Sequence, residues 1–167
     1  MKKNFDFIGL PNFTMSFNGA VINSKVMFGD KSIEHDRPMQ GQSPFLANTG
    51  LFYQNDKQTL NIGLMYNIIG KRIVGIGKVD TSVGGSIDNN IPDMYEMPRN
   101  AVDLSVSCKL SKHVELSAGI RDILAQSVLF KQFPKFYDDA GNIQKREQAT
   151  KKFNPGRNIS VSIKVNL

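Results

Sequence analysis

The sequence Arg157-Asn-Ile-Ser-Val-Ser-Ile-Lys-Val-Asn-Leu167 alternates between polar and apolar residues from Asn158 to its end. Side chains of a β-strand point to opposite faces in turn, so this stretch predicts a strand with two different faces. The apolar face carries Ile159, Val161, Ile163, Val165 and Leu167, and the polar face carries Asn158, Ser160, Ser162, Lys164 and Asn166. The strand is about as long as one that crosses a bilayer when tilted in a barrel.

Other stretches of the chain alternate with the same period of two. Clear alternation covers residues 44–54, 60–68, 102–110 and 114–121, a weaker pattern covers residues 12–28, and residues 5–8 resemble the end of a further strand. The apolar phase comprises Phe13, Met15, Phe17, Val21, Phe45, Ala47, Thr49, Leu51, Tyr53, Leu60, Ile62, Leu64, Tyr66, Ile68, Val102, Leu104, Val106, Cys108, Leu110, Val114, Leu116, Ala118 and Ile120. We find no amphipathic helix of useful length. The sequence therefore predicts an all-β fold of six or seven antiparallel strands.

Short and long connections alternate between these strands. Residues 54–57 and 111–113 are tight turns of hairpin length. Residues 29–42, 77–99 and 131–156 are long polar stretches rich in Asp, Asn, Gly, Pro and Lys. All short connections then fall at one end of the sheet and all long ones at the other. Transmembrane β-barrels have this asymmetry, with short periplasmic turns and long extracellular loops, whereas loops beyond about 15 residues are uncommon in compact soluble domains.

The composition of the chain sets limits on its function. Its 167 residues are typical of one domain. The net charge is +6, but the densest basic cluster (Lys145, Arg146, Lys151 and Lys152) lies in a polar stretch, which favours a solvated loop over a nucleic-acid interface. The single cysteine, Cys108, excludes an internal disulfide and a cysteine metal cluster, and its place on the apolar phase indicates a small apolar residue.

Membrane helices and signal peptides are not evident in the sequence. No run of 18 apolar residues occurs, which excludes a transmembrane helix. Lys2 and Lys3 resemble the start of a signal peptide, but no apolar h-region follows them. We therefore expect either a protein that is not exported or a piece of a longer chain.

The polar phase of the strands is mostly Ser, Asn and Gly, with few charges. A water-facing exterior ordinarily carries more Lys and Glu, so we expect the polar phase to face a lumen and the apolar phase to face lipid. Phe13 and Tyr53 lie beside the short turns, and Phe45 and Tyr66 lie toward the long loops. Aromatic girdles form at these two levels of a membrane barrel.

Asp122 breaks the apolar phase that begins at Val114. A carboxylate is costly in hydrocarbon and less so near the interface. We therefore expect Asp122 at the outer rim or at a bulge, with Arg121 as a candidate partner. We interpret it as a bend at the end of a strand rather than as a binding site.

The sequence predicts no catalytic or metal site. The two histidines, His35 and His113, are expected at opposite ends of the sheet, where they cannot share a metal or a triad. We interpret residues 34–36 (Glu-His-Asp) as a solvated loop. Residues 138–142 (Asp-Asp-Ala-Gly-Asn) lack the later Glu and the helices of a calcium loop, so we interpret them as a turn.

The glycine pairs of the chain do not predict a cofactor site either. Gly75-Ile-Gly77 and Gly84-Gly85 are not followed by Gly-Lys-Ser/Thr or by a helix, so they do not form a phosphate or dinucleotide loop. We therefore expect no cofactor and no enzymatic activity.

Five stretches, taken in order, resemble the late barrel of TonB-dependent outer-membrane receptors of the Bacteroidetes type. They are residues 37–56, Tyr66-Asn-Ile-Ile-Gly-Lys-Arg72, Pro92-Asp-Met-Tyr-Glu-Met-Pro-Arg-Asn100, Val102-Asp-Leu-Ser-Val106 and Gly119-Ile-Arg-Asp-Ile-Leu124. The resemblance covers nearly the whole chain from Asn12 onward. It implies a barrel of about 22 strands around an N-terminal plug domain. It also implies import of a scarce substrate, such as an iron–siderophore complex, cobalamin or a glycan, driven through TonB.

The chain departs from that family by omission. It lacks a signal peptide, a TonB box, a plug and about two-thirds of the strands, and Leu167 stands where an aromatic residue is commoner. We therefore expect residues 1–167 to be a single C-terminal part of a barrel in the cell outer membrane. Its expected partners are outer-membrane lipid, the rest of the barrel with its plug, and TonB in the full-length protein. Substrate contacts are expected from the three long loops and the lumen face.

Two other hypotheses remain open on the sequence alone. A complete small outer-membrane barrel with a structural or adhesin role requires the first strand to pair with residues 157–167. A soluble lipocalin-like binding barrel requires a dry, apolar interior. An enzyme in a barrel is the least expected, because no nucleophile–histidine pair can be assembled.

Overall fold

The computed structural model describes residues 2–5, 9–30, 32–80, 82, 87 and 90–166. Within them the protein is all-β, and no helix long and apolar enough to cross a membrane occurs there. The strands are β1 (Lys2–Phe5), β2 (Leu10–Val21), β3 (Phe45–Gln54), β4 (Leu60–Ile69), β5 (Arg72–Gly75), β6 (Met94–Glu96), β7 (Arg99–Lys109), β8 (Val114–Arg121), β9 (Val128–Gln132), β10 (Lys135–Tyr137), β11 (Ile143–Lys145), β12 (Gln148–Phe153) and β13 (Asn158–Val165).

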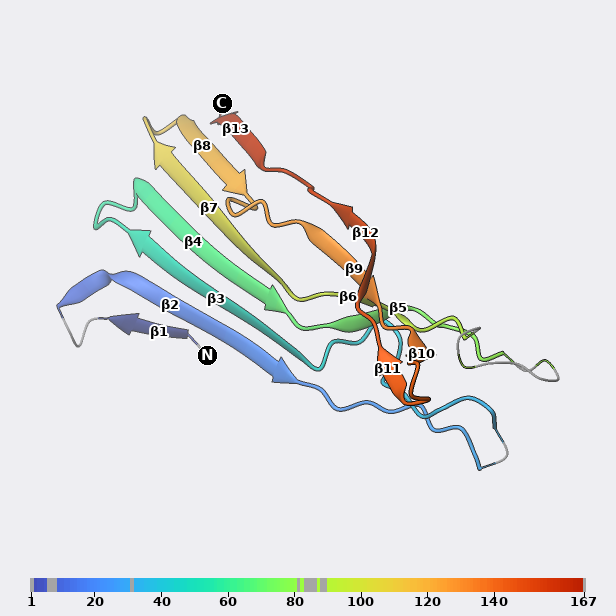
Figure 1. Ribbon diagram of the computed structural model, residues 1–167. Helices are drawn as coiled ribbons and strands as arrows, with labels where there is room; N and C mark the ends of the chain where they lie inside the picture. The colour runs from blue at the N-terminus through green and yellow to red at the C-terminus, as the bar shows by residue number, and fades with distance from the viewer. Residues whose placement is uncertain are drawn as a thin grey trace.

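Seven strands form the main sheet, in the order β1-β2-β3-β4-β7-β8-β13, and every neighbouring pair is antiparallel (Figure 1). The predicted strands over residues 44–54, 60–68, 102–110, 114–121 and 157–167 correspond to β3, β4, β7, β8 and β13. The weak pattern over residues 12–28 gives a strand that ends earlier, at Val21. The first strand covers Lys2–Phe5, and residues 6–8 of the predicted segment lie outside the described residues.

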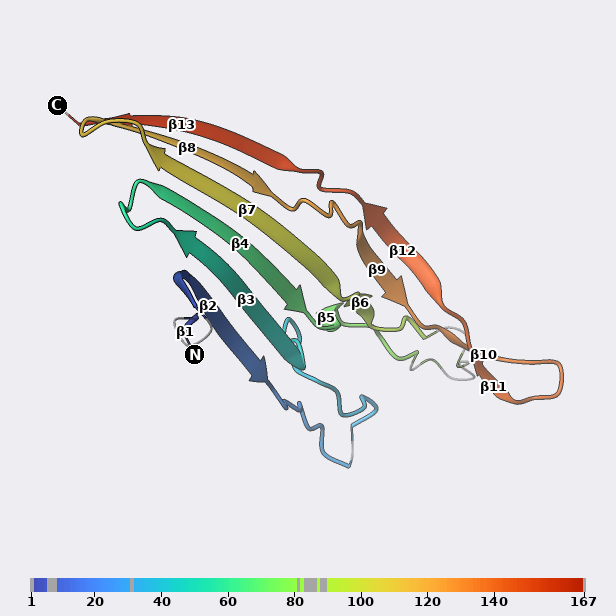
Figure 2. The ribbon, with the colours of Figure 1, turned by 90° about the vertical axis from the view of Figure 1, so that its left-hand side faces the viewer.

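A second sheet, the extension sheet, continues the main sheet toward the long loops (Figure 2). Its strands lie in the order β5-β6-β9-β12. Each is next in the chain to one strand of the main sheet, namely β4, β7, β8 and β13 respectively, so the two sheets have the same strand order. The predictions of structureless loops over residues 77–99 and 131–156 are therefore wrong in part, because β6, β9, β10, β11 and β12 lie wholly or partly in those stretches. These strands are short, and bulges shift the register at Ile73/Gly75 and Ala149/Lys151, so the sequence shows no sustained alternation there.

The connections alternate between short and long, as predicted (Figure 1). The β3–β4 turn is closed by Asn55, whose Oδ1 accepts hydrogen bonds from the backbone N–H groups of Thr59 (2.8 Å) and Leu60 (2.9 Å). The β7–β8 turn is closed by Ser111, whose Oγ accepts the N–H of Val114 at 3.1 Å. Both turns lie at one end of the main sheet, and the long connections extend from the other.

The register of the main sheet places the apolar phase of every long strand on one face. One row of directly paired residues across six strands is Phe13, Tyr53, Ile62, Val106, Ala118 and Val161. The next row is polar and runs Gln54, Asn61, Ser107, Ser117 and Ser162. Directly paired residues lie on the same face of an antiparallel sheet. The main sheet therefore has one continuous apolar face and one continuous polar face.

The sheet has almost no core of its own. Ile73 (1 % exposed) is the one buried apolar side chain among the described residues. The apolar side chains of β13 are 58–71 % exposed, from Val165 to Ile159. The accessible surface is 11889 Å², against about 8,200 Å² for a compact monomer of 18.6 kDa. The main sheet is thus a single layer, and no other element that the structure describes covers either of its faces.

The polar face is the concave one. Two open hollows of about 630 and 720 Å³ lie on it, lined mainly by its Ser, Asn, Thr and Gly residues. Phe52 is the one aromatic residue of this face in β2, β3, β4, β7 and β8, and its ring lies over Gly50 and Gly63. The apolar face is therefore convex.

Gly50 is a position where an added methyl group should destabilise the sheet. A Cβ built there would lie 2.6 Å from the Phe52 ring and 2.8 Å from Ser16 Oγ. Gly50→Ala should therefore lower the free energy of unfolding by about 1–3 kcal/mol, as measured by urea unfolding. Gly119→Ala is the matched control, because a Cβ built there would come no closer than 3.3 Å to Ser160 Oγ. It should lower the free energy of unfolding far less. If Gly50→Ala and the unmodified protein unfold at the same urea concentration, the close approach of Phe52 and Ser16 does not exclude a side chain at position 50.

Candidate functional site

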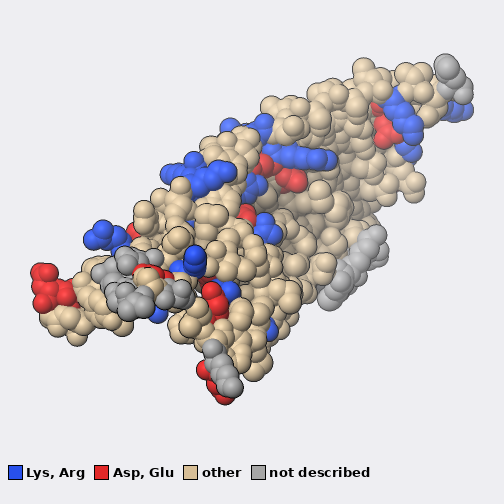
Figure 3. All heavy atoms as spheres, turned by 90° about the vertical axis from the view of Figure 1, so that its right-hand side faces the viewer, with Lys and Arg blue, Asp and Glu red and all other residues tan. Residues whose placement is uncertain are grey.

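The long connections meet around a hollow of about 680 Å³, here called the loop-end pocket. It is lined by residues 34–38, 71, 77–79, 87, 90–93, 95, 133, 135 and 145. These residues come from the β2–β3, β4–β5, β5–β6 and β9–β12 connections and from the extension sheet. Figure 3 shows this end of the molecule, where Lys, Arg, Asp and Glu side chains gather, while the sheet behind it is mostly uncharged.

Arg37 joins two of these connections. Its Nη1 lies 3.1 Å from Glu34 Oε2 and 3.5 Å from Asp93 Oδ1, and its guanidinium carbon lies 5.0 Å from the centre of the Phe28 ring. Asp93 Oδ1 also accepts the backbone N–H of Gly77 at 2.8 Å. The two carboxylates of this cluster therefore share one guanidinium, and the three side chains together keep one negative charge.

Lys71 is held between two aromatic rings. Its Nζ lies 4.0 Å from the centre of the Tyr95 ring and 4.4 Å from that of Phe133. The two rings are 5.9 Å apart and nearly perpendicular. Each ring face attracts an ammonium by about 0.5–2 kcal/mol. Lys71 follows β4, Tyr95 lies on β6 and Phe133 follows β9. The contact therefore joins three separate segments at the wall of the pocket.

Lys135 and Lys145 lie on the β10–β11 hairpin, which projects from the long-loop end (Figure 1). They are direct partners in its antiparallel register, so both side chains lie on one face of the hairpin. Both line the loop-end pocket. The turn between them is closed by Asp138, whose carboxylate accepts the N–H of Asn142 at 2.7 Å and the side-chain amide of Gln144 at 3.0 Å. These hydrogen bonds, Gln144 first, lower the pKa of Asp138 from its ordinary value, and they agree with a turn at residues 138–142.

Glu34 and Asp36 do not act together as ligands. Glu34 pairs with Arg37, whereas Asp36 Oδ2 lies 2.7 Å from Lys25 Nζ, and its Oδ1 accepts the N–H of Phe28 at 3.0 Å. The hydrogen bond from Lys25, followed by that from Phe28, lowers the pKa of Asp36. Among the described residues no cluster of three His, Cys, Asp or Glu side chains has the geometry to hold a metal ion.

The two histidines lie at opposite ends of the main sheet, as predicted. His35 lines the loop-end pocket. His113 lies in the β7–β8 turn, where its Nδ1 is 3.0 Å from the carbonyl oxygen of Asn166. Of the glycine pairs, Gly75 belongs to β5 and Gly77 borders the pocket, while Gly84 and Gly85 lie outside the described residues.

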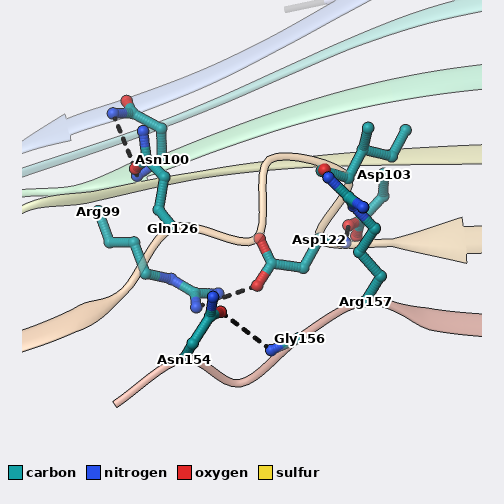
Figure 4. Close-up of polar contacts among 9 residues, drawn as sticks. Arg99, Asn100, Asp103, Asp122, Gln126, Asn154, Gly156 and Arg157 are labelled. Carbon is teal, nitrogen blue, oxygen red and sulfur yellow. Dashed lines mark hydrogen bonds and ion pairs between the residues drawn. The ribbon is translucent and has the colours of Figure 1, made fainter. Parts of the chain in front are cut away.

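Asp122 lies where β8 ends and the main sheet gives way to the extension sheet. Its φ of 55° is in the left-handed region, which turns its side chain out of the apolar phase. Its Oδ2 lies 3.1 Å from Nη1 of Arg99, and its backbone N–H donates to Asp103 Oδ1 at 2.8 Å (Figure 4). The side chain is 13 % exposed, and neither carboxylate oxygen accepts a hydrogen bond from the described residues. The predicted bend is confirmed, and the partner is Arg99 rather than Arg121.

Further polar contacts join strands of the main sheet to the β8–β9 connection at this break. Tyr66 donates from its hydroxyl to Asn100 Oδ1 at 2.6 Å, and the backbone N–H of Asn100 donates to Gln126 Oε1 at 2.9 Å. Arg157 Nε donates to the carbonyl oxygen of Ile123 at 2.7 Å (Figure 4). The break between the sheets is therefore a defined junction.

The sequence did not indicate Lys71, Tyr95, Phe133 or Lys135 as site residues, and it placed Lys145 in a basic cluster that we interpreted as a solvated loop, whereas Lys145 lies on β11 and lines the pocket. A signal was present for Lys135 and Lys145, since they stand symmetrically about the predicted turn at residues 138–142. Lys71 and its two rings are far apart in sequence, and only the sheet order brings them together. No known protein family, curated protein or solved structure matches this chain.

Proposed function

We propose that this chain is the C-terminal portion of the β-barrel of a TonB-dependent receptor in the cell outer membrane. In this proposal the convex apolar face meets lipid and the concave polar face lines the lumen. The observation that carries it is the single-layer sheet, whose apolar face is continuous across six strands and is covered by no other element within the described part of the chain. Exposed apolar area on this scale is unfavourable in water at roughly 25 cal/mol per Å², and a bilayer removes that cost.

The direction of curvature separates this proposal from a soluble binding barrel. A lipocalin-like barrel holds its apolar side chains on the concave side, around its ligand. Here the hollows lie on the Ser, Asn and Gly face, so the polarity is the reverse. A membrane barrel has its apolar band outside and its polar face inside.

The open edges of the main sheet favour a larger barrel over a small closed one. A complete small barrel would require β1 to pair with β13. In the described structure β13 pairs with β8 and β1 pairs with β2, and these two strands form the opposite edges of the sheet. An open edge accepts a further strand, and a receptor barrel supplies strands on both sides.

In the full-length receptor, we propose, the loop-end pocket faces the cell exterior and meets a scarce substrate such as an iron–siderophore complex, cobalamin or a glycan. The concave face then borders the plug domain, and TonB supplies the energy for uptake. No enzymatic step is included in the proposal.

Lipid contact can be tested with two neighbouring positions on β7. In a Cys108→Ser background, Val106→Cys places a fluorophore on the apolar face and Ser107→Cys places one on the polar face. In vesicles with brominated lipids, we expect strong quenching at position 106 and weak quenching at position 107. Equal quenching would rule out the assigned faces. The membrane proposal also fails if the purified chain is folded and monomeric without detergent.

The receptor assignment needs a separate test, because lipid contact alone fits any membrane barrel. The proposal expects the gene that encodes this chain to encode further barrel strands and a plug domain. It also expects that a strain without TonB and a strain without this gene lose uptake of the same substrate. Normal uptake in the strain without TonB would contradict it.

A further inference from the structure

We propose that the loop-end pocket binds a small polyanion, held by the four lysines that line it, Lys71, Lys78, Lys135 and Lys145. The ligand class is a small molecule with two or more carboxylate, sulfate or phosphate groups. This inference rests on the proposed function, in which the pocket faces the cell exterior, and it narrows the substrate class of that receptor.

The charges of the pocket are the first support for this inference. Each carboxylate that lines it has a cationic partner, since Glu34 and Asp93 pair with Arg37 and Asp36 pairs with Lys25. By contrast, Lys71, Lys78, Lys135 and Lys145 form no ion pair with any residue that the structure describes. The lining as a whole has five cationic side chains and three carboxylates, so the pocket keeps a net charge of +2.

The β10–β11 hairpin gives the second, independent support. Lys135 and Lys145 are directly opposite in its register, where the Cβ atoms of paired residues are about 5 Å apart and like charges are destabilising. The hairpin is an isolated two-stranded sheet, which is marginally stable at best in water. An anion bound between the two ammonium groups offsets their repulsion and stabilises the hairpin.

The third support is the size and lining of the pocket. A volume of about 680 Å³ is within the usual range for a small-molecule site. Tyr95 and Phe133 supply flat apolar surface beside Lys71. A ligand that combines acidic groups with a ring, as an acidic oligosaccharide does, matches both the ammonium groups and the aromatic wall.

The experiment measures binding to the full chain in nonionic detergent by titration calorimetry. The probes are trigalacturonate, inorganic tripolyphosphate and the neutral sugar maltotriose. We expect the anions to bind at least tenfold more tightly than maltotriose, with an affinity that falls as salt is raised. Tighter binding of trigalacturonate indicates a carboxylated ligand, and tighter binding of tripolyphosphate indicates a phosphorylated one. Binding of neither anion, or equal binding of all three probes, overturns the inference.

Variants locate the site. Lys135→Gln/Lys145→Gln should weaken anion binding at least tenfold. Lys57→Gln/Lys112→Gln removes the same charge from the two short turns at the other end of the sheet, and should leave the affinity unchanged. Equal losses in the two double variants would mean that net charge alone attracts the anion, and the site would be rejected.

A third variant excludes misfolding of the hairpin as the cause of lost binding. Lys135→Glu places opposite charges across the β10–β11 ladder, which favours the hairpin while it removes the anion site. It should abolish anion binding and keep the native circular dichroism spectrum. Native affinity in this variant contradicts the inference. The proposed function has its own readout, the lipid quenching at positions 106 and 107, so either proposal can fail alone.

Discussion

Replacing Leu64 by arginine should lower the free energy of unfolding in lipid vesicles by about 2–4 kcal/mol. Leu64 lies near the middle of β4, on the apolar face, between its register partners Leu51 and Leu104. If this face meets lipid, as proposed, a guanidinium there must enter hydrocarbon or deform the bilayer. Urea unfolding in vesicles, followed by far-ultraviolet circular dichroism, measures the loss.

Met65→Arg is the matched control for this prediction. Met65 is the next residue of β4 and is 44 % exposed, against 42 % for Leu64, but it lies on the concave face opposite Asp103. An arginine there remains in the polar hollow beside a carboxylate and should cost less than about 1 kcal/mol. If water covered both faces of the sheet, Leu64→Arg and Met65→Arg would lower the free energy of unfolding by the same small amount. That result would contradict the assignment of the apolar face to lipid.

The second large effect is expected at the junction of the two sheets. Arg99→Met should destabilise the protein by about 3 kcal/mol, the lower end of the cost of breaking a buried ion pair, because it leaves the Asp122 carboxylate nearly buried and uncompensated. Asp122→Asn should cost only about 1 kcal/mol. The asparagine tolerates the left-handed backbone of this position, and Arg99, at 27 % exposed, still reaches water.

A double-mutant cycle completes this test. Arg99→Met/Asp122→Asn should be more stable than Arg99→Met alone, because the stranded charge is gone. The free energies come from urea unfolding of all four proteins under one set of conditions. If Arg99→Met proves as mild as Asp122→Asn, the ion pair does not hold the junction.

Predictions from the sequence were most successful where alternation was long and unbroken. The stretches that became β3, β4, β7, β8 and β13 have eight or more residues of period two, and the structure places strands over all of them. β6 and β11 have three residues each, which is too few to show a period. Their strands exist because a neighbour offers a free edge, and a single sequence does not show that edge.

Asp122 illustrates a partial success of the same kind. Its place in the apolar phase indicated a bend, because a carboxylate is unfavourable on that face. The left-handed φ and the partner Arg99 did not follow from the pattern, since Arg99 lies on the neighbouring strand β7. The neighbouring residue Arg121 was the wrong candidate because Asp122 lies beyond the end of β8, where its left-handed backbone directs the carboxylate to Arg99.

By itself the sequence determined that each long strand has one apolar and one polar face, because alternation is a local property with a period of two. It also determined that turns alternate with long connections. Only the tertiary structure decided that all the apolar faces coincide, that the polar face is the concave one, and that Lys71, Tyr95, Phe133, Lys135 and Lys145 surround one pocket. Those properties depend on the register and order of strands far apart in the chain. The apolar pattern and the turns fix the register of two paired strands, but the alternation within one strand does not show which strands pair.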